Sequence, residues 1–135
     1  MTNKLELFRC SICGNLVEVV LPGAGELVCC GEAMEKLTPK TNEMSFEKHV
    51  PVIEMKDGEV AIRVGSTPHP MEEDHYIQFV EAIAGDNRYL KRKYFKPGEE
   101  PVMKFKCECK EGVGSREYCN MHGLWASSEA NGHGK

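Results

Sequence analysis

The sequence predicts a mainly β protein in which a small metal-stabilised segment precedes an antiparallel β-sandwich. Three observations lead to this fold class. Four of the seven cysteines fall within the first 30 residues. The chain from Phe46 onward is rich in β-branched and aromatic residues, and turn signals such as Lys56-Asp57-Gly58 divide it into short runs. No stretch of the 135 residues has a convincing helical period.

Residues 1–37 form the first predicted unit. Two strand-like runs, 6–9 and 16–21, flank a turn that contains Cys10 and Cys13. A piece of about 40 residues or fewer buries too little apolar area to fold without a metal, disulfides or a partner chain. The cysteines supply that constraint. The polar residues 38–45 that follow contain a proline and are typical of a linker.

Residues 46–126 form the predicted sandwich. Strands are expected at 50–55, 59–64, 75–84, 88–95, 102–109 and 115–119. Short strands at regular spacing favour an antiparallel sandwich or barrel. The small, polar tail at 127–135 is expected to be disordered.

Composition and charge exclude several classes of function. A net charge of −4 gives no general attraction for nucleic acid or for an anionic substrate. Neither an N-terminal apolar signal nor a run of about 18 apolar residues is present, so no membrane association and a cytoplasmic location are expected. One basic stretch is expected to be a solvated strand face, with a docking patch as the alternative; it comprises Arg88, Lys91, Arg92, Lys93, Lys96, Lys104 and Lys106.

The first metal-ligating candidates are Cys10, Cys13, Cys29 and Cys30. The odd number of cysteines and the absence of a signal peptide argue against a disulfide framework. Four thiolates complete a tetrahedral site, and iron and zinc both fit; a zinc site that only folds the segment is the alternative. The adjacent Cys29 and Cys30 depart from the usual zinc-ribbon spacing. The arrangement resembles desulforedoxin, a small iron protein, over about 37 residues.

The second candidates are histidines. Four of the five, together with a cysteine three residues before the last, have contexts unlike ordinary surface positions: His49, His69, His75, Cys119 and His122. A thiolate with several imidazoles suits iron or copper, or zinc. His133, in the tail, is expected to be a bystander. An electron carrier with a blue-copper-like site is one alternative, although it would leave two histidines unexplained; a zinc-stabilised binding module is another.

Three motifs carry a resemblance to desulfoferrodoxin, the two-iron superoxide reductase. They are F-E-K-H-V-P-V at 46–52, H-P-M-E-x-x-H at 69–75 and E-Y-C-N-x-H-G-x-W at 117–125. The resemblance covers residues 1 to about 126 and implies an immunoglobulin-like sandwich after the desulforedoxin-like unit. It also implies a second iron with four equatorial histidines (49, 69, 75 and 122), Cys119 as axial thiolate and a sixth position open to solvent.

The function implied by this resemblance is one-electron reduction of superoxide to hydrogen peroxide without release of oxygen. It implies two irons per chain, an electron donor such as rubredoxin, and a homodimer. Lys48 would attract superoxide, and Glu47 would bind the oxidised iron after peroxide leaves; the alternative for Glu47 is a strand-end carboxylate paired with Lys48.

Four further residues have weaker assignments. Trp125 and Tyr118 are expected to pack beside the second metal. Cys107 and Cys109 lie two residues apart on an expected strand and so face the same side. They are predicted to be buried thiols, with a redox pair or cysteines without a function as the alternatives. Leu124 stands where the resembled family often has a histidine, outside the ligand motif.

Overall fold

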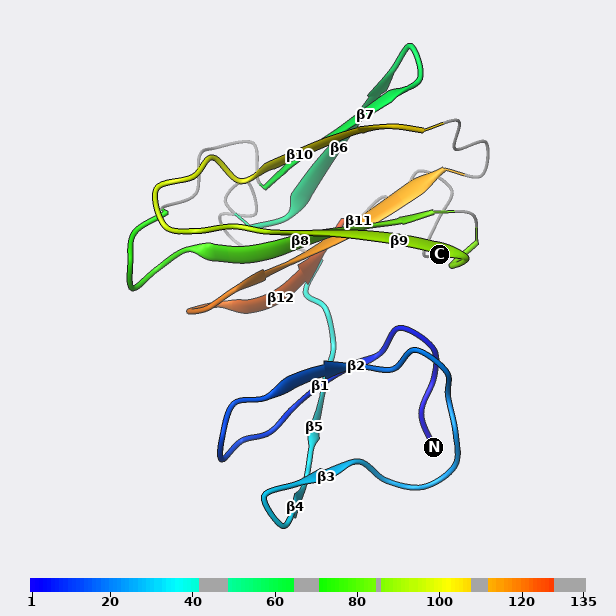
Figure 1. Ribbon diagram of the computed structural model, residues 1–135, viewed down its shortest axis with the longest axis vertical. Coiled ribbons are helices and arrows are strands. Elements are labelled where there is room, and N and C mark those ends of the chain that lie inside the picture. Colours follow the sequence, from blue (N-terminus) through cyan, green and yellow to red (C-terminus); the bar gives the residue numbers. More distant parts are fainter. Residues whose placement is uncertain (42–48, 65–70, 85, 108–111, 128–135) are drawn as a thin grey trace. The chain divides into compact units, whose positions relative to one another are not determined.

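The computed structural model describes residues 1–41, 49–64, 71–84, 86–107 and 112–127. Every regular element in these ranges is a strand (Figure 1), which confirms the predicted mainly β fold class. The described residues contain no helix able to cross a membrane. The chain divides into two compact units, Met1–Thr38 and Pro39–Lys135.

The N-terminal unit is built from five very short strands. They are β1 (Leu7–Arg9), β2 (Leu16–Glu18), β3 (Val28–Cys29), β4 (Glu32–Ala33) and β5 (Glu35–Leu37). Strands β2, β1 and β5 form one sheet in that order, and β3 pairs with β4. The buried apolar residues of this unit are only Leu7, Cys10 and Val19. Such a core is too small to hold the unit folded, so the cysteine cluster has to contribute.

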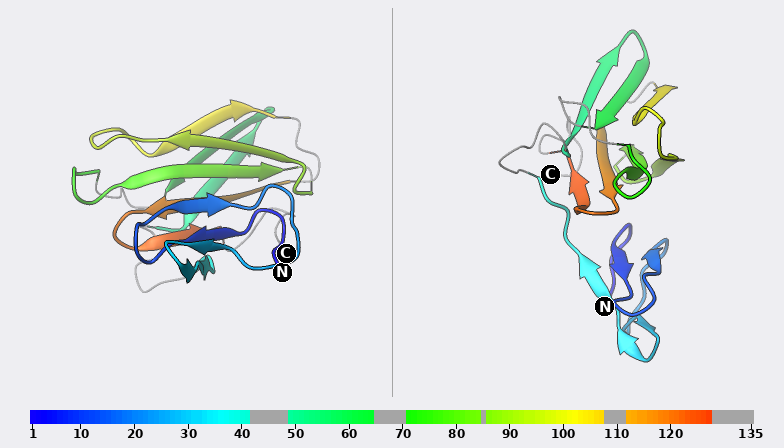
Figure 2. Two further views of the ribbon diagram at one scale, coloured as in Figure 1. Left: turned by 60° about the horizontal axis from the view of Figure 1, so that its bottom comes forward. Right: turned by 90° about the vertical axis from the view of Figure 1, so that its left-hand side faces the viewer.

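The second unit is a two-sheet sandwich (Figures 1 and 2). Its strands are β6 (Pro51–Lys56), β7 (Glu59–Val64), β8 (Ile77–Ala84), β9 (Tyr89–Tyr94), β10 (Val102–Lys106), β11 (Val113–Cys119) and β12 (Gly123–Ala126). One sheet has the order β10-β7-β6 and the other β12-β11-β8-β9, with antiparallel neighbours throughout. The turn between β6 and β7 has positive φ at Asp57 (51°) and Gly58 (78°), as a tight hairpin requires.

The core of the sandwich comes from alternate residues on the facing strands. Val60, Ile62 and Val64 of β7 pack with Val80 and Ala82 of β8. Cys119, at the end of β11, belongs to the same cluster and is fully buried. The core therefore extends directly to one of the predicted metal ligands.

A buried charge cluster crosses the outer face of the four-stranded sheet. Glu81 on β8 is fully buried and lies between Arg92 on β9 and Arg116 on β11, its direct neighbours in the strand register. Its carboxylate accepts from Arg92 at 2.6 Å and 2.7 Å and from Arg116 Nε. A buried carboxylate is tolerated because both of its oxygens are satisfied by cations.

Six of the seven residues of the basic stretch are exposed, as expected for a solvated face, and Arg92 is half-buried. Lys91 and Lys93 are paired with Ala82 and Val80, so they occupy the inward face of edge strand β9. The Nζ of Lys91 lies 5.3 Å from the Phe105 ring centroid, and that of Lys93 donates to the Val102 carbonyl at 3.2 Å. Inward-pointing lysines of this kind keep an exposed edge from pairing with other chains.

The expectation for Cys107 requires correction. The strand predicted at 102–109 ends at Lys106, and Cys107 follows it, packed against the core cluster. Its side chain is half-buried and disulfide-bonded rather than a buried free thiol. Cys109 lies outside the described residues.

Candidate metal centres

The four cysteines of the N-terminal unit converge on one point. The Sγ atoms of Cys10, Cys13, Cys29 and Cys30 all lie within 4.8 Å of one another. Cys29 Sγ is 3.6 Å from Cys13 Sγ and 4.0 Å from Cys30 Sγ. A tetrahedral ion with metal–sulfur bonds of about 2.3 Å places its sulfurs about 3.8 Å apart. The group therefore has the spacing of a four-thiolate metal site.

Backbone conformation explains how adjacent cysteines can face one metal. In an extended strand, Cys29 and Cys30 would point to opposite sides. Cys29 ends β3, but Cys30 has a left-handed conformation with φ of 55°, and Gly31 follows with φ of 78°. This turn brings the two sulfurs to the same side of the chain.

The thiols of this group differ in acidity. The backbone N–H groups of Cys13 and Ile12 point at Cys10 Sγ, each at 3.4 Å, and they lower the pKa of the Cys10 thiol to about 6. Hydrogen bonds with Cys13 and Cys10 raise the pKa of the Cys30 thiol to about 12. Cys10 is thus the more acidic of these two thiols, and metal binding has to displace a proton from Cys30.

A second group of ligand atoms lies at one end of the sandwich. Atoms of His49, His75, Cys119 and His122 also lie within 4.8 Å of one another. His49 Nε2 is 2.9 Å from His122 Nδ1, and Cys119 Sγ is 3.9 Å from the same nitrogen. Three imidazoles and a thiolate form a donor set suited to a redox-active ion.

The chain around Cys119 and His122 gives this group a buried side and an exposed side. A register irregularity between Tyr118 and Cys119 ends the regular pairing of β11 with β8, and Cys119 lies fully buried there. A tight turn leads to Gly123 (φ 85°), and the His122 side chain is exposed. The thiolate thus approaches from the core, and a small solute can approach from the His122 side.

Trp125 packs against this group as expected. Its indole stacks on the His49 ring, with centroids 4.8 Å apart and an interplanar angle of 16°. His49 is only 6% exposed, so this stacking and burial together fix its ring. The His122 ring lies edge-on to both His49 and His75, at centroid distances of 4.7 Å and 5.0 Å. Tyr118 instead stacks on Phe79, on the outer face of the sheet.

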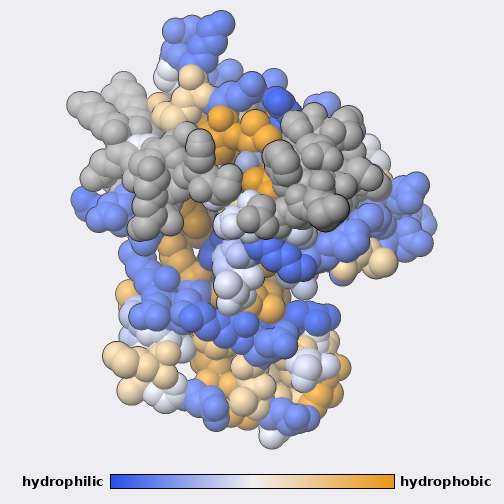
Figure 3. Space-filling view, turned by 180° about the vertical axis from the view of Figure 1, so that it is seen from behind, coloured by the Kyte–Doolittle hydropathy of each residue, from blue (hydrophilic) through white to orange (hydrophobic). Residues whose placement is uncertain are grey.

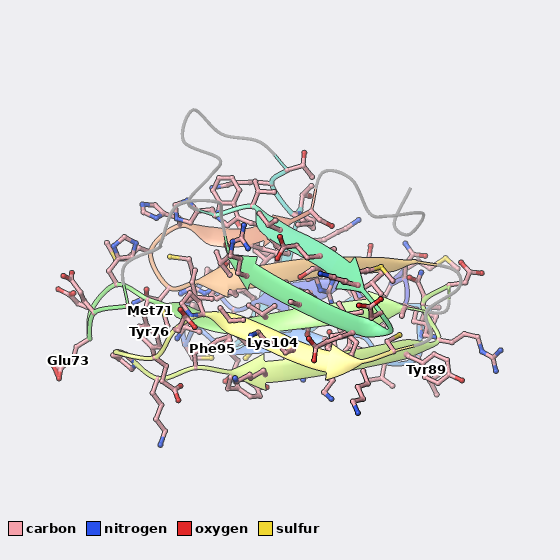
Figure 4. The ribbon with its side chains drawn as sticks, turned by 90° about the horizontal axis from the view of Figure 1, so that it is seen from above. Met71, Glu73, Tyr76, Tyr89, Phe95 and Lys104 are labelled. Atoms are coloured by element: carbon pink, nitrogen blue, oxygen red, sulfur yellow. The ribbon has the colours of Figure 1, made fainter. Side chains whose placement is uncertain are left out.

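His75 is held by the segment around it. Glu72 and His75 exchange backbone hydrogen bonds of 2.9 Å and 3.0 Å, which closes a tight turn. Figure 4 shows Met71 and Tyr76, on either side of this turn, at the end of the sandwich opposite Tyr89. Met71 anchors the turn, because its Sδ accepts from the Ile77 N–H at 3.3 Å and its carbonyl accepts from Gly98.

Asn120 connects the turn of His75 with the turn of Cys119 and His122. Its Oδ1 accepts from the Tyr76 N–H at 2.9 Å, and its Nδ2 donates to the Asp74 carbonyl at 3.1 Å. These two backbone groups belong to the residues on either side of His75. The Asn120 side chain therefore helps to fix the position of His75 relative to Cys119, together with the bond from the Asn120 N–H to the Tyr76 carbonyl at 3.2 Å.

Replacing Asn120 with alanine is expected to weaken metal binding at this group by about 10–100-fold, the usual effect of removing a residue that orients ligands. Competition with a chelator measures the affinity. Met121→Ala is the matched control, because Met121 lies in the same turn with a 62% exposed side chain. Equal affinity in Asn120→Ala and the unaltered protein would contradict the clamping role.

The structure thus brings together eight of the predicted ligands in two groups. The remaining predicted site residues, Glu47, Lys48 and His69, lie outside the described residues. Sequence reasoning missed Asn120 as well as Glu117, which is fully buried on the inward face two residues before Cys119. Glu117 could have been found from the sequence, because residues two positions apart on a strand face the same side and Cys119 was already a predicted ligand.

Comparison with known proteins gives the same two-part organisation. A family model described as "Desulfoferrodoxin, N-terminal domain" matches residues 2–37, and one described as "Desulfoferrodoxin" matches residues 41–128. The desulfoferrodoxin homolog of Methanothermobacter thermautotrophicus is 49% identical over 125 residues, covering 93% of this chain and 99% of the relative.

Several similar proteins carry the name superoxide reductase, among them one from Pyrococcus abyssi and one from Treponema pallidum. The one from Pyrococcus abyssi is 34% identical over 108 residues, which cover 68% of this chain and 94% of the relative. The crystal structure of the superoxide reductase from Treponema pallidum superimposes with a TM-score of 0.72 at 26% identity, covering 93% of this chain and 98% of that one.

Proposed function

Because the chain belongs to the desulfoferrodoxin family, we propose that it is a superoxide reductase, which converts superoxide to hydrogen peroxide with one electron and two protons. The observation that carries this proposal is the convergence of three imidazoles and one buried thiolate within 4.8 Å. The two ligand groups match the two iron centres of desulfoferrodoxins.

Each part of the second group has a task in this reaction. Its ferrous ion would supply the electron. Cys119 would donate electron density from the buried side, as cysteinate does in other iron enzymes. The exposed side next to His122 gives superoxide and water access, so protons can be delivered from solvent. His69 is proposed as the fourth imidazole and Glu47 as the carboxylate that binds the oxidised iron.

Lys48 is proposed to attract superoxide. Two unit charges about 4 Å apart interact by about 1 kcal/mol in water, and more where water is excluded. We therefore expect Lys48→Ala to slow the bimolecular reaction with superoxide several-fold and to weaken its dependence on ionic strength. Pulse radiolysis over a range of salt concentrations measures both quantities.

The control for Lys48 is Lys56→Ala, which removes the same charge at the exposed far end of β6. An unaltered rate and salt dependence in Lys48→Ala, or an equal loss in Lys56→Ala, would remove Lys48 from the site.

A homodimer is part of the proposal, and the surface of the N-terminal unit supports it. Six large apolar side chains of this unit are exposed: Met1, Ile12, Val17, Val20, Leu21 and Val28. Apolar surface is visible on this unit in Figure 3. A groove of about 620 Å³ is lined by Val17, Leu21, Val28 and Met34 among others. Burial of this surface against a second copy would supply the apolar area that the small core lacks.

The electron donor is proposed to be a small redox protein such as rubredoxin. The alternative of an electron carrier without catalysis is less well supported, because a blue-copper-like site uses two histidines, whereas three lie together with Cys119 here.

One measurement tests the function directly. Anaerobically reduced protein supplied with a donor is mixed with superoxide, and the peroxide formed and oxygen evolved are quantified. One mole of peroxide per mole of superoxide, without oxygen, is the expected result. Half as much peroxide, accompanied by oxygen, would mean dismutation, and no accelerated consumption would favour the electron carrier.

A further inference from the structure

Lys40 lies in a segment that sequence reasoning assigned to a linker, yet it joins the sandwich. Its N–H donates to the Leu124 carbonyl at 3.0 Å, and its carbonyl accepts from the Ala126 N–H at 2.8 Å. Lys40 and Trp125 form a parallel bridge. Lys40 therefore pairs with the outer edge of β12, the strand that directly follows the turn containing His122.

The Lys40 side chain reaches that turn. Its Nζ donates to the His122 carbonyl at 3.2 Å and lies 5.0 Å from the centroid of the Trp125 ring. The indole Nε1 of Trp125 donates to the same carbonyl, also at 3.2 Å. Two side chains thus hold one backbone oxygen of a metal-ligand residue, and one of these bonds is assisted by charge.

The hold on the carbonyl adds to the contacts that the His122 ring makes with His49 and His75 on the exposed side of the metal centre. The peptide bond after His122 leads into Gly123 at φ 85°, and glycine tolerates other backbone conformations at small cost. The carbonyl carbon is bonded to the Cα that carries the imidazole, so donors that hold the carbonyl restrain the backbone from which the imidazole projects. The two donors, Lys40 Nζ and Trp125 Nε1, favour one orientation of the His122 carbonyl.

We propose that Lys40 is a positioning residue of the histidine–cysteine metal centre, acting through the His122 carbonyl and the Trp125 ring to keep the His122 imidazole directed at the metal. This inference rests on the proposed function, since it takes the metal to be the ferrous iron of the superoxide reductase site. Lys40 contacts neither the ligand atoms nor the substrate in this role.

The rate of iron release tests this role without superoxide. Trp125 is the only tryptophan of the chain, and its ring stacks on His49. An open-shell ion at this group is expected to quench its fluorescence, so recovery of fluorescence after addition of EDTA reports release of the ion next to Trp125. The Lys40→Met variant is expected to release ferrous iron up to about tenfold faster than the unaltered protein. This is the low end of the loss of affinity caused by removing ligand-orienting residues, because Lys40 is exposed.

Two further variants make the test specific. Lys40→Arg keeps a charged donor and is expected to return the release rate to within about twofold of the unaltered protein. Lys56→Met removes an exposed lysine at the far end of β6 and is expected to leave release unchanged. Equal release from Lys40→Met and the unaltered protein, or an equal acceleration in Lys56→Met, would overturn the proposal.

The same data separate this inference from the proposed function. If the protein fails to reduce superoxide but iron release still depends on Lys40, the function is wrong and the positioning role holds. If superoxide is reduced and iron release does not depend on Lys40, the function holds and the positioning role is wrong.

Discussion

Cys119→Ser is expected to lower the bimolecular rate constant for superoxide by at least about 100-fold. Replacing a residue that only orients metal ligands lowers metal affinity or activity by about 10–100-fold, and replacing a direct thiolate ligand is expected to lower it more. The serine hydroxyl is protonated at neutral pH, is a poor ligand for a soft or borderline ion, and donates less electron density from the buried side. Pulse radiolysis measures the rate, and the loss of thiolate-to-iron absorption provides a second readout.

Ser115→Ala is the matched control for Cys119→Ser. Ser115 is buried on the same inward face of β11, four residues before Cys119, and outside both ligand groups. We expect it to leave the rate constant and the absorption unchanged. A Cys119→Ser protein that retains both would show that the buried thiolate is not an iron ligand.

Glu81→Gln is expected to lower the free energy of unfolding of the sandwich by roughly 3–5 kcal/mol. The carboxylate is fully buried and pairs with both Arg92 and Arg116, so its neutralisation leaves two cations without their counter-charge in a site of low polarity. Chemical unfolding of the iron-loaded protein, followed through Trp125, measures the change in the second unit.

An exposed ion pair in the other sheet provides the comparison. Glu54 and Arg63 lie 3.2 Å apart with side chains 62% and 44% exposed. Surface pairs contribute about 0–1 kcal/mol, so Glu54→Gln is expected to change stability by less than about 1 kcal/mol. Similar losses in Glu54→Gln and Glu81→Gln would mean that burial of the charge cluster has no special effect.

Local sequence patterns predicted the strands well where those patterns alone decide the structure. Strand β7 has the predicted bounds, 59–64, because alternation and the Asp57-Gly58 turn define both its face and its start. Strand β8 begins at Ile77 rather than at residue 75, because the turn closed by Glu72 and His75 occupies the expected start.

Strand β12 was not predicted. It has four residues, begins with Gly123, and is defined by its pairing with β11 rather than by its own composition. Short strands of this kind depend on tertiary context more than on intrinsic preference.

The ligand types were predictable, but their supporting contacts were not. Cysteine and histidine spacing identifies donors, because few residue types bind such ions. Asn120 and Lys40 act instead on backbone carbonyls of residues 46 and 82 positions away. No local pattern carries that information, since any polar side chain can meet a carbonyl once the fold places it there.

The separation of ligands along the chain has a consequence for biosynthesis. Cys13 and Cys29 are 16 positions apart, whereas His49 and His122 are 73 positions apart. Domains fold as units during synthesis, the N-terminal one first. The four-cysteine group can therefore take up its ion while the ribosome is still translating the sandwich. The histidine–cysteine group exists only after β11 and β12 have been made and paired, so its iron enters a domain whose translation is complete.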